Sequence, residues 1–312
     1  MKIIFFGTDD FAAKHLESLL SSSHQILACI TQPDRPKGRG MKMISPPVKT
    51  IAERRKIPVF QPADFCDQEF LQKLRDFQAD LFVVIAYGKI LSATILQIPK
   101  VYSINVHASL LPQYRGAAPI NWVIINGEKE TGISIIKMNP KMDAGEIVAQ
   151  KKIKIAEEAT AVTLRAQLVE LGTSCLLETI EAIAQGKTKL TPQDESKVTF
   201  AAKLTKELGL IPWQKSAIEI HNLVRGLLPW PAAYTFFQGK MLKILETSWD
   251  SSVPFDSPVG TIVEIEKERV AVATGRAALW IKKVQPESGK PMDVRSFQAG
   301  HALQVGNQFM ES

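Results

Sequence analysis

Residues 101–112 have the sequence VYSINVHASLLP, and this stretch predicts both a strand and the point where the strand opens into a loop. Its apolar first half is typical of a strand, and Pro112 followed by Gly116 predicts the loop. Successive strand side chains point to opposite faces, so Asn105 and His107 project to the same side. Because ligands of open α/β sheets bind where strands end, this pair predicts a functional site.

Short apolar runs on both sides of this stretch are rich in Ile, Val and Phe, which is typical of strands buried in a parallel sheet. Amphipathic stretches between them predict helices. This alternation predicts an α/β domain with a doubly wound, mostly parallel, Rossmann-like sheet. The predicted strands are residues 3–6, 26–31, 81–87, 102–106 and 133–138, and the predicted helices are residues 11–20, 45–56, 68–77, 118–125 and 160–185.

The first predicted turn, Gly7-Thr8-Asp9-Asp10-Phe11, has the position of a nucleotide-binding loop but the glycine pattern of neither dinucleotide nor P-loop sites. We therefore interpret it as a helix start in which Asp9 or Asp10 is the N-cap.

The composition changes after Gly186, where a polar stretch with Pro192 predicts a linker. One helix (213–227) and five short strands (234–237, 241–247, 260–265, 270–274 and 279–284) are predicted beyond it. A small open β-barrel of the oligonucleotide-binding (OB-like) type has this content. The predicted organisation is a catalytic domain (1–187), a linker (188–205) and a C-terminal barrel domain (206–312).

The bulk composition is that of an ordinary globular protein, with 312 residues, 45% hydrophobic and 22% charged. A net charge of +6 permits a polyanionic partner without requiring one. The three cysteines, Cys29, Cys66 and Cys175, have no paired spacing, so we expect neither a metal site nor a disulfide framework. No run approaches the roughly 20 apolar residues of a membrane span. We expect a cytoplasmic protein with no membrane contact.

A third polar residue, Asp143, follows the predicted strand that ends near Met138. Two polar side chains such as Asn105 and His107 are often merely satisfied by neighbouring backbone. If two adjacent strands deliver all three to one sheet edge, however, the carboxylate orients the imidazole and favours its charged form. The amide and the protonated imidazole can then stabilise an oxyanion. This set favours acyl transfer without a covalent enzyme intermediate, since no Ser or Cys has a nucleophile-elbow context.

A basic loop, residues 32–42 (QPDRPKGRGMK), follows the second predicted strand. It carries Arg35, Lys37, Arg39 and Lys42. A solvated connection and a contact to a phosphate backbone are equally compatible with this composition.

Seven motifs together resemble the methionyl-tRNA formyltransferase family, within the wider folate-dependent formyltransferases. The resemblance covers nearly the whole chain. Asp9 departs from it where Pro is expected, and Ala144 where Thr is commoner. The motifs are Phe6-Gly7-Thr8, residues 32–36 (QPDRP), Ala86-Tyr87-Gly88, residues 105–112 (NVHASLLP), residues 114–120 (YRGAAPI), residues 142–145 (MDAG) and Pro229-Trp230-Pro231.

The resemblance implies transfer of a formyl group from 10-formyltetrahydrofolate to the α-amino group of methionyl initiator tRNA, by a monomer without a metal. It makes Asn105, His107 and Asp143 catalytic, and it implies that the C-terminal barrel holds the acceptor arm. It implies a folate pocket formed by Ser109, Leu110, Leu111 and Pro112, with Tyr87 and Gly88 near the pterin, and a tRNA contact formed by Arg35, Lys37, Arg39 and Lys42.

Three alternatives remain open. A formyltransferase acting on a small amine or nucleotide sugar would share the catalytic trio but need neither the basic loop nor the barrel. A folate hydrolase or dehydrogenase relative would release the formyl group to water. An RNA-binding protein without enzymatic activity would explain the basic charge and the barrel, but it would give no function to Asn105, His107 and Asp143.

Overall fold

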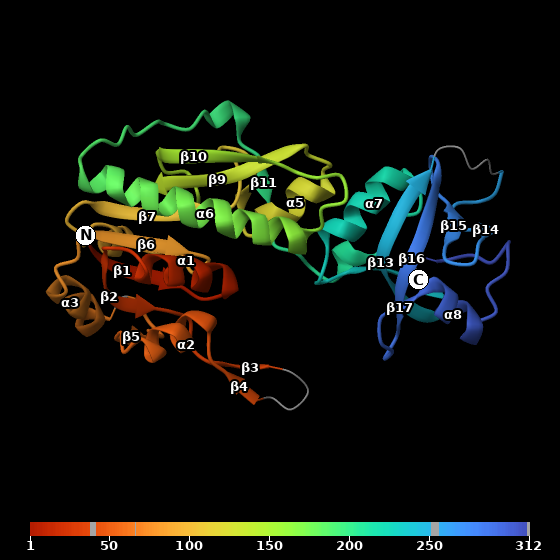
Figure 1. Ribbon diagram of the computed structural model, residues 1–312, viewed down its shortest axis with the longest axis horizontal. Helices are drawn as coiled ribbons and strands as arrows, with labels where there is room; N and C mark the ends of the chain where they lie inside the picture. The colour runs from red at the N-terminus through yellow and green to blue at the C-terminus, as the bar shows by residue number, and fades with distance from the viewer. Residues whose placement is uncertain (38–41, 66, 251–255, 311–312) are drawn as a thin grey trace. The chain divides into compact units, whose positions relative to one another are not determined.

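The computed structural model describes residues 1–37, 42–65, 67–250 and 256–310 (Figure 1). Arg39, one of the predicted tRNA contacts, lies outside these residues. The chain divides into two compact units, each built from separate lengths of sequence. The N-terminal unit contains residues 1–116, 131–153 and 165–200, and the C-terminal unit contains residues 117–130, 154–164 and 201–312.

The N-terminal unit is built around a sheet of seven described strands in the order β10-β9-β7-β6-β1-β2-β5. The five strands from β7 to β5 are parallel, and β9 is antiparallel to β7. The predicted doubly wound, mostly parallel sheet is therefore confirmed. The strands are β1 (Lys2–Gly7), β2 (Gln25–Ile30), β5 (Val59–Phe60), β6 (Leu81–Ile85), β7 (Tyr102–His107), β9 (Glu130–Lys137) and β10 (Ile147–Lys154).

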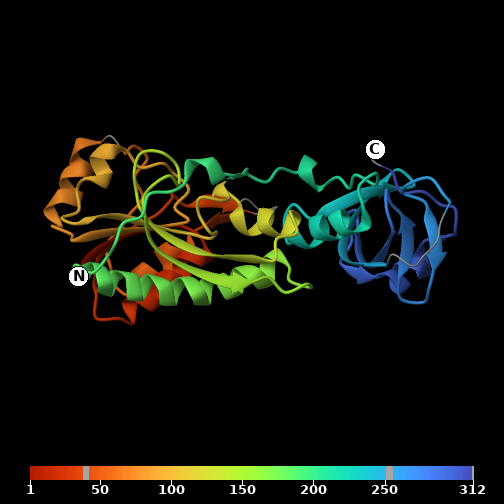
Figure 2. The same ribbon diagram turned by 90° about the horizontal axis from the view of Figure 1, so that it is seen from above.

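Helices cover both faces of this sheet (Figure 2). α1 and α6 lie on one face, whereas α3 and α4 pack their apolar residues against the other, on strands β1, β2 and β6. Helix α1 begins as predicted, since the Asp9 carboxylate accepts a hydrogen bond from the Ala12 amide as the N-cap. The helices are α1 (Asp10–Leu20), α2 (Pro47–Arg54), α3 (Gln68–Asp76), α4 (Ala93–Leu96) and α6 (Ala161–Ala184).

Several short elements complete the description of the first two hundred residues. The basic loop forms a small antiparallel hairpin of β3 (Arg35–Lys37) and β4 (Lys42–Ile44). The remaining short elements are β8 (Arg115–Gly116), the 3₁₀ turn η1 (Glu195–Lys197) and β11 (Phe200–Ala201).

The prediction that residues 133–138 form another parallel strand is wrong, because β9 runs antiparallel to β7. For β9 to be parallel to β7, the chain between them would have to cross over the sheet, usually through a helix that packs on its face. The helix between these strands, α5 (Pro119–Ile125), instead belongs to the C-terminal unit. Strand β10 was not predicted, because half of its sequence IVAQKKIK is polar and every second side chain near its end is exposed.

The C-terminal unit contains the predicted antiparallel barrel-like sheet, with strands in the order β12-β13-β16-β15-β14 and β17 paired with β16. Its elements are η2 (Glu207–Gly209), α7 (Ala217–Gly226), β12 (Ala233–Phe237), β13 (Lys240–Asp250), β14 (Ile262–Ile265), β15 (Val270–Ala273), β16 (Ala278–Pro286), β17 (Met292–Asp293) and α8 (Val294–Gly300).

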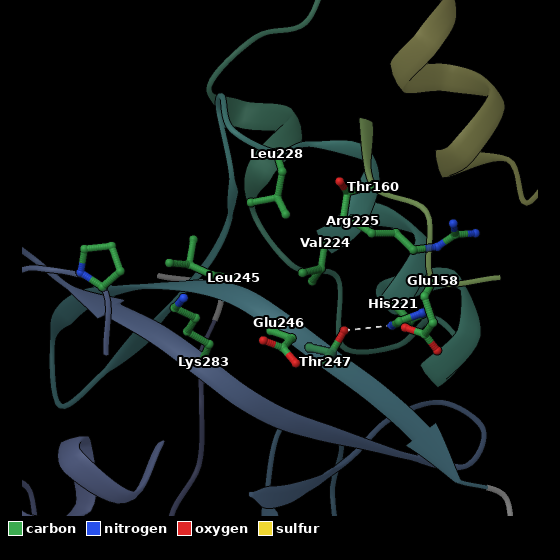
Figure 3. A pocket seen from close by; sticks show the side chains of 11 residues that line it. Glu158, Thr160, His221, Val224, Arg225, Leu228, Leu245, Glu246, Thr247 and Lys283 are labelled. Carbon is green, nitrogen blue, oxygen red and sulfur yellow. Dashed lines mark hydrogen bonds between the residues drawn. The ribbon is translucent and has the colours of Figure 1, made fainter. Parts of the chain in front are cut away.

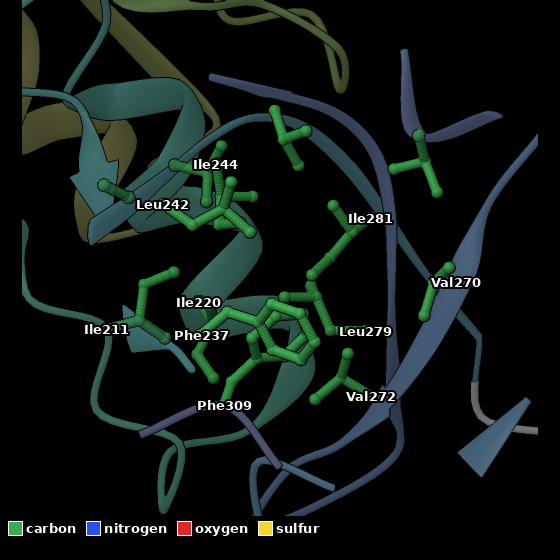
Figure 4. Close-up of a cluster of buried hydrophobic side chains, with 14 of the residues drawn as sticks. Ile211, Ile220, Phe237, Leu242, Ile244, Val270, Val272, Leu279, Ile281 and Phe309 are labelled. Atoms are coloured by element: carbon green, nitrogen blue, oxygen red, sulfur yellow. The ribbon is translucent and has the colours of Figure 1, made fainter. Parts of the chain in front are cut away.

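The core of this unit lies between the sheet and α7 (Figure 4). Trp213 stacks on Phe309 with ring centroids 5.8 Å apart. The segment around Phe309 also joins the two ends of the sheet, since Met310 exchanges two backbone hydrogen bonds with Phe236 of β12 while Asn307 accepts one from Ile262 of β14. This segment therefore covers edges that would otherwise be open.

Two lengths of chain that precede residue 165 complete the C-terminal unit, residues 117–130 and 154–164. Asn121 of α5 donates a side-chain hydrogen bond of 2.7 Å to the carbonyl of Gly226. Arg225 donates one of 2.7 Å to the carbonyl of Ala159. An apolar cluster joins the segment 117–130 to the rest of this unit, and it includes Ala118, Leu204, Leu223 and Leu227.

A buried histidine in the N-terminal unit is expected to make its stability depend on pH. His15 of α1 is fully buried, its Nδ1 lies 2.8 Å from the Phe11 carbonyl, and its Nε2 has no partner among the described residues. Gly172 of α6 packs directly against this Nε2, because a Cβ added to Gly172 would lie only 2.5 Å from it. Burial lowers the pKa of His15 from 6.5 to about 4.

We expect His15 to weaken folding as the pH falls from 6.5 towards 4, because the unfolded chain binds a proton that the folded chain excludes. The loss reaches about 3 kcal/mol near pH 4. Urea titrations of the wild type and His15→Leu between pH 7.5 and 4.5 should show the wild type losing more free energy of unfolding. Parallel curves, or the same difference for the control His301→Leu, would contradict this.

Candidate active site

The carboxyl ends of the parallel strands bring together the first predicted site residues. β7 ends with His107, and Asn105 lies opposite Val84 of β6 in the register of the sheet. In the next strand pair, Gly7 of β1 lies opposite Ile85 of β6. The Asn105 side chain is half-buried, and no described residue hydrogen-bonds its amide. This amide is therefore free to donate to a ligand.

His107 is held by oxygen atoms at both ring nitrogens. Its Nε2 lies 2.8 Å from the carbonyl of Tyr114, so Nε2 carries a proton and donates it. Its Nδ1 lies 3.6 Å from Oδ2 of Asp143. The side chains of His107 and Asp143 are only 7% and 14% exposed. A protonated imidazole would offer an N–H to each oxygen, and at 3.6 Å its Nδ1–H could be shared with an incoming acceptor.

Asp143 reaches the imidazole by a route that differs from our expectation. Since β9 is antiparallel, its end at Lys137 lies beside Ile104 in β7, and the loop between β9 and β10 carries Asp143 to His107. Asp143 has a φ of +51°, in the left-handed region. Its Oδ2 accepts a hydrogen bond of 2.9 Å from the Gly116 amide. The structure thus brings Asp143 and His107 together without two parallel strand ends.

The loop after β7 is fixed by internal hydrogen bonds. The Ser109 hydroxyl donates to the carbonyl of Gln113 at 2.7 Å, so it is used within the loop. Ser134 of β9 donates to the Ser109 carbonyl and accepts from the Leu111 amide. Ser109 and Leu111 are buried, whereas the other two predicted folate contacts, Leu110 and Pro112, are half-buried.

Tyr87 and Gly88 follow β6 at the same edge of the sheet. The Tyr87 ring packs edge-on against Phe6, and its carbonyl accepts hydrogen bonds from Thr8 and Gln32. Burial raises the pKa of the Tyr87 phenol, whose hydroxyl has no partner among the described residues. Gly88 has a φ of +82°, and a Cβ there would meet nothing within 4 Å. The backbone is therefore open at this point.

The hairpin β3–β4 carries the described members of the predicted tRNA contact. Arg35 is exposed and donates to the Gln32 side chain at 3.2 Å. Lys37 and Lys42 are paired in the register of the two strands. At the base of the hairpin, hydrogen bonds from Lys49 and Gln61 lower the pKa of Asp34. The hairpin is thus anchored at its base by a charge-assisted network.

The sequence analysis missed Gln193, which lies in the predicted linker. Its side-chain Nε2 donates to the carbonyls of Asp143 and Gly145, at 2.8 Å and 2.7 Å. A single glutamine in a polar stretch carries no pattern that predicts such a contact.

The C-terminal unit has a cavity of about 440 Å³ that contains none of the predicted site residues (Figure 3). His221 of α7 lies in its wall, with Nδ1 2.9 Å from the Thr247 hydroxyl. Burial and the neighbouring Arg225 lower the pKa of His221, so it is neutral at physiological pH. The wall also contains Glu158, Glu246 and Lys283, so charges of both signs line the cavity.

The described residues contain no cluster of three or more His, Cys, Asp or Glu side chains placed to hold a metal ion. Within the same part of the chain, no helix has both the length and the apolar character needed to cross a membrane.

Comparison with known proteins places the chain among the formyltransferases. The family model described as formyl transferase matches residues 1–180, and the formyl transferase C-terminal domain matches residues 203–302. An N-formyltransferase from Helicobacter canadensis, solved with folinic acid and dTDP-3-aminofucose, has the same fold, with a TM-score of 0.69. It is 20% identical, and the match covers 92% of this chain and 100% of that one.

Two bacterial relatives are much closer in sequence. The methionyl-tRNA formyltransferase of Alkaliphilus oremlandii is 46% identical over 98% of this chain and 99% of its own. That of Desulfotalea psychrophila is 45% identical over 96% of this chain and 93% of its own. The chain therefore belongs to the methionyl-tRNA formyltransferase family.

Proposed function

We propose that this protein transfers the formyl group of 10-formyltetrahydrofolate to the α-amino group of methionyl initiator tRNA, in the cytoplasm and as a monomer. The observation that supports it most is the distance of 3.6 Å between His107 Nδ1 and Asp143 Oδ2, beside the unbonded amide of Asn105. The names of the relatives, and the folinic acid bound to the N-formyltransferase from Helicobacter canadensis, agree with this substrate pair.

In the proposed reaction, the neutral amine of the methionyl ester attacks the formyl carbon on N10 of the folate. The C–N bond forms while the carbonyl electron pair moves to oxygen. The Asn105 amide and the Nδ1–H of His107 donate to this oxyanion, because Nε2–H is already bonded to Tyr114. Asp143 faces the protonated imidazole that this step requires, and its carboxylate accepts the proton that the new ammonium group loses. Collapse breaks the bond to N10, which takes up the proton that Asp143 accepted, so the carboxylate is restored.

The folate is proposed to lie at the carboxyl edge of the sheet. Leu110 and Pro112 are half-buried and can pack on its ring system, while the buried Ser109 and Leu111 hold the loop that presents them. Tyr87 and the open backbone at Gly88 come from the neighbouring strand β6 and are proposed to lie near the pterin.

The basic hairpin is proposed to contact the acceptor end of the tRNA through Arg35, Lys37, Arg39 and Lys42, since arginine and lysine side chains bind phosphates. The C-terminal domain proposed from the sequence, residues 206–312, would hold the acceptor arm, with residues 188–205 as the linker.

A product assay tests the function. The protein is incubated with 10-formyltetrahydrofolate and methionyl initiator tRNA, with methionyl elongator tRNA as the control. We expect formyl-methionine on the initiator tRNA and at least tenfold less on the elongator. Formylation only of a small amine or nucleotide sugar, formate released equally with or without acceptor, or tRNA binding without turnover would each favour one of the alternatives and refute the proposal.

A further inference from the structure

We propose that Gln193 is a positioning residue, which holds the Asp143 loop in its reactive conformation with the help of Arg115 and Glu195. The inference rests on the proposed role of Asp143 as partner of His107. It assigns a function to a segment of chain that lies between the two family matches, residues 1–180 and 203–302.

Gln193 uses both ends of its side chain. Its Nε2 donates to the carbonyls on either side of Ala144, at 2.8 Å for Asp143 and 2.7 Å for Gly145. Its Oε1 accepts two hydrogen bonds from Arg115, of 3.1 Å from Nε and 2.8 Å from Nη2. The amide therefore connects the Asp143 loop to Arg115.

Arg115 is itself fixed. Its side chain is 6% exposed and forms a second, forked contact with Glu195, with distances of 2.8 Å and 3.2 Å. Hydrogen bonds from Arg115 lower the pKa of Glu195, which keeps this pair charged. The Arg115 amide also donates to the carbonyl of Thr199, and the Tyr114 amide donates to the Thr199 hydroxyl. These hydrogen bonds hold the segment that carries Gln193 beside the strand β8.

The same short strand holds Asp143 from its other side. Gly116, which follows Arg115 directly, donates its amide proton to Asp143 Oδ2 at 2.9 Å. Asp143 is therefore held at its carboxylate by the backbone of β8, and at its own carbonyl by the side chain of Gln193.

The Asp143 loop needs such support because its conformation is unfavourable. A left-handed backbone is less favourable for Asp than for glycine, although Asp tolerates it better than most residues, and Asp143 has a φ of +51°. Its neighbour Met142 is 54% exposed and contributes little packing. If the loop relaxed by about 1 Å, the carboxylate would no longer face Nδ1 of His107, and such displacements can cost on the order of 100-fold in rate.

Two substitutions of Gln193 distinguish its proposed role, holding the Asp143 loop, from the simpler role of anchoring the Arg115 side chain. Gln193→Ala removes all four hydrogen bonds. Gln193→Glu keeps an acceptor for Arg115, with added charge attraction, but replaces the donor by oxygen atoms that repel the two loop carbonyls. If Gln193 only anchored Arg115, Gln193→Glu would behave like the wild type. If it holds the loop, Gln193→Glu fails at least as badly as Gln193→Ala.

We expect both variants to lower kcat on the order of 30- to 100-fold, with the KM for folate and tRNA changed less than about threefold. Lys197→Ala is the matched control and should keep wild-type kcat, because Lys197 lies in the same segment and its side chain pairs with Asp194 alone among the described residues. Thermal unfolding checks that each variant is folded.

A second readout does not depend on activity. In the wild type the Gly116 amide is protected by Asp143, so Gln193→Glu should speed its hydrogen exchange on the order of tenfold while leaving amides of β1 unchanged. Wild-type kcat and unchanged Gly116 exchange in Gln193→Glu would overturn the inference. Full activity of Asp143→Asn would refute the role given to Asp143, and absence of formylation by the wild type would refute the proposed function. Both results differ from an active wild type in which only Gln193→Glu is unaffected.

Discussion

Asp143→Asn is expected to lower kcat on the order of 1,000-fold, the largest effect of any single substitution that preserves the fold. The asparagine side chain has the same size and can still accept the hydrogen bond from Gly116. It has no charge to stabilise the protonated His107 and cannot accept the proton of the attacking amine. Removing a general base typically costs two to four orders of magnitude.

The measurement is single-turnover formylation of methionyl initiator tRNA at saturating folate, which isolates the chemical step from product release. Asp76→Asn, an exposed carboxylate on α3, provides a control with the same chemical change. A rate within about tenfold of the wild type for Asp143→Asn would contradict the proposed mechanism, because the carboxylate would then have no part in proton transfer.

Asn105→Ala should lower kcat by roughly two to three orders of magnitude, because one preorganised oxyanion donor contributes about 2.7–4 kcal/mol to the barrier. The Asn105 amide bonds to no described residue, so its loss should change the melting temperature by no more than a few degrees. The variant is therefore expected to bind folate normally and to react slowly.

A double variant separates the oxyanion role from a binding role. Asn105 and His107 donate to the same oxygen in the proposed transition state, so Asn105→Ala with His107→Ala should lose less than the product of the two single losses. A fully multiplicative loss, or a raised KM with unchanged kcat for Asn105→Ala, would show that Asn105 binds the substrate and does not stabilise the oxyanion.

The sequence predicted those parts of the fold that have a strong local pattern. The runs IIFF and LFVV are continuous and apolar, and they form β1 and β6 in the middle of the sheet. Asp9 before an amphipathic stretch marked the start of α1. The alternation around Asn105 and His107 placed both side chains on the same side of β7.

The elements that were missed are determined by distant contacts. The direction of β9 depends on where the intervening helix packs, which no local pattern encodes. The segment around Phe309 is ordered by its hydrogen bonds to β12 and to the start of β14. Gln193 acts through two backbone carbonyls about fifty residues earlier in the chain. Every residue has such a carbonyl, so the amino-acid sequence does not indicate which carbonyls Gln193 will contact.

The interleaving of the two units has a practical consequence for anyone who wishes to dissect or recombine this molecule. A fragment that begins at residue 203 would leave behind α5 and Ala159, the partners of Gly226 and Arg225. Leu223 and Leu227 would then face water, and the separated piece would be prone to aggregate. Chimeras between relatives should therefore exchange residues 117–130 and 154–164 together with the second half, so that each interior is inherited whole.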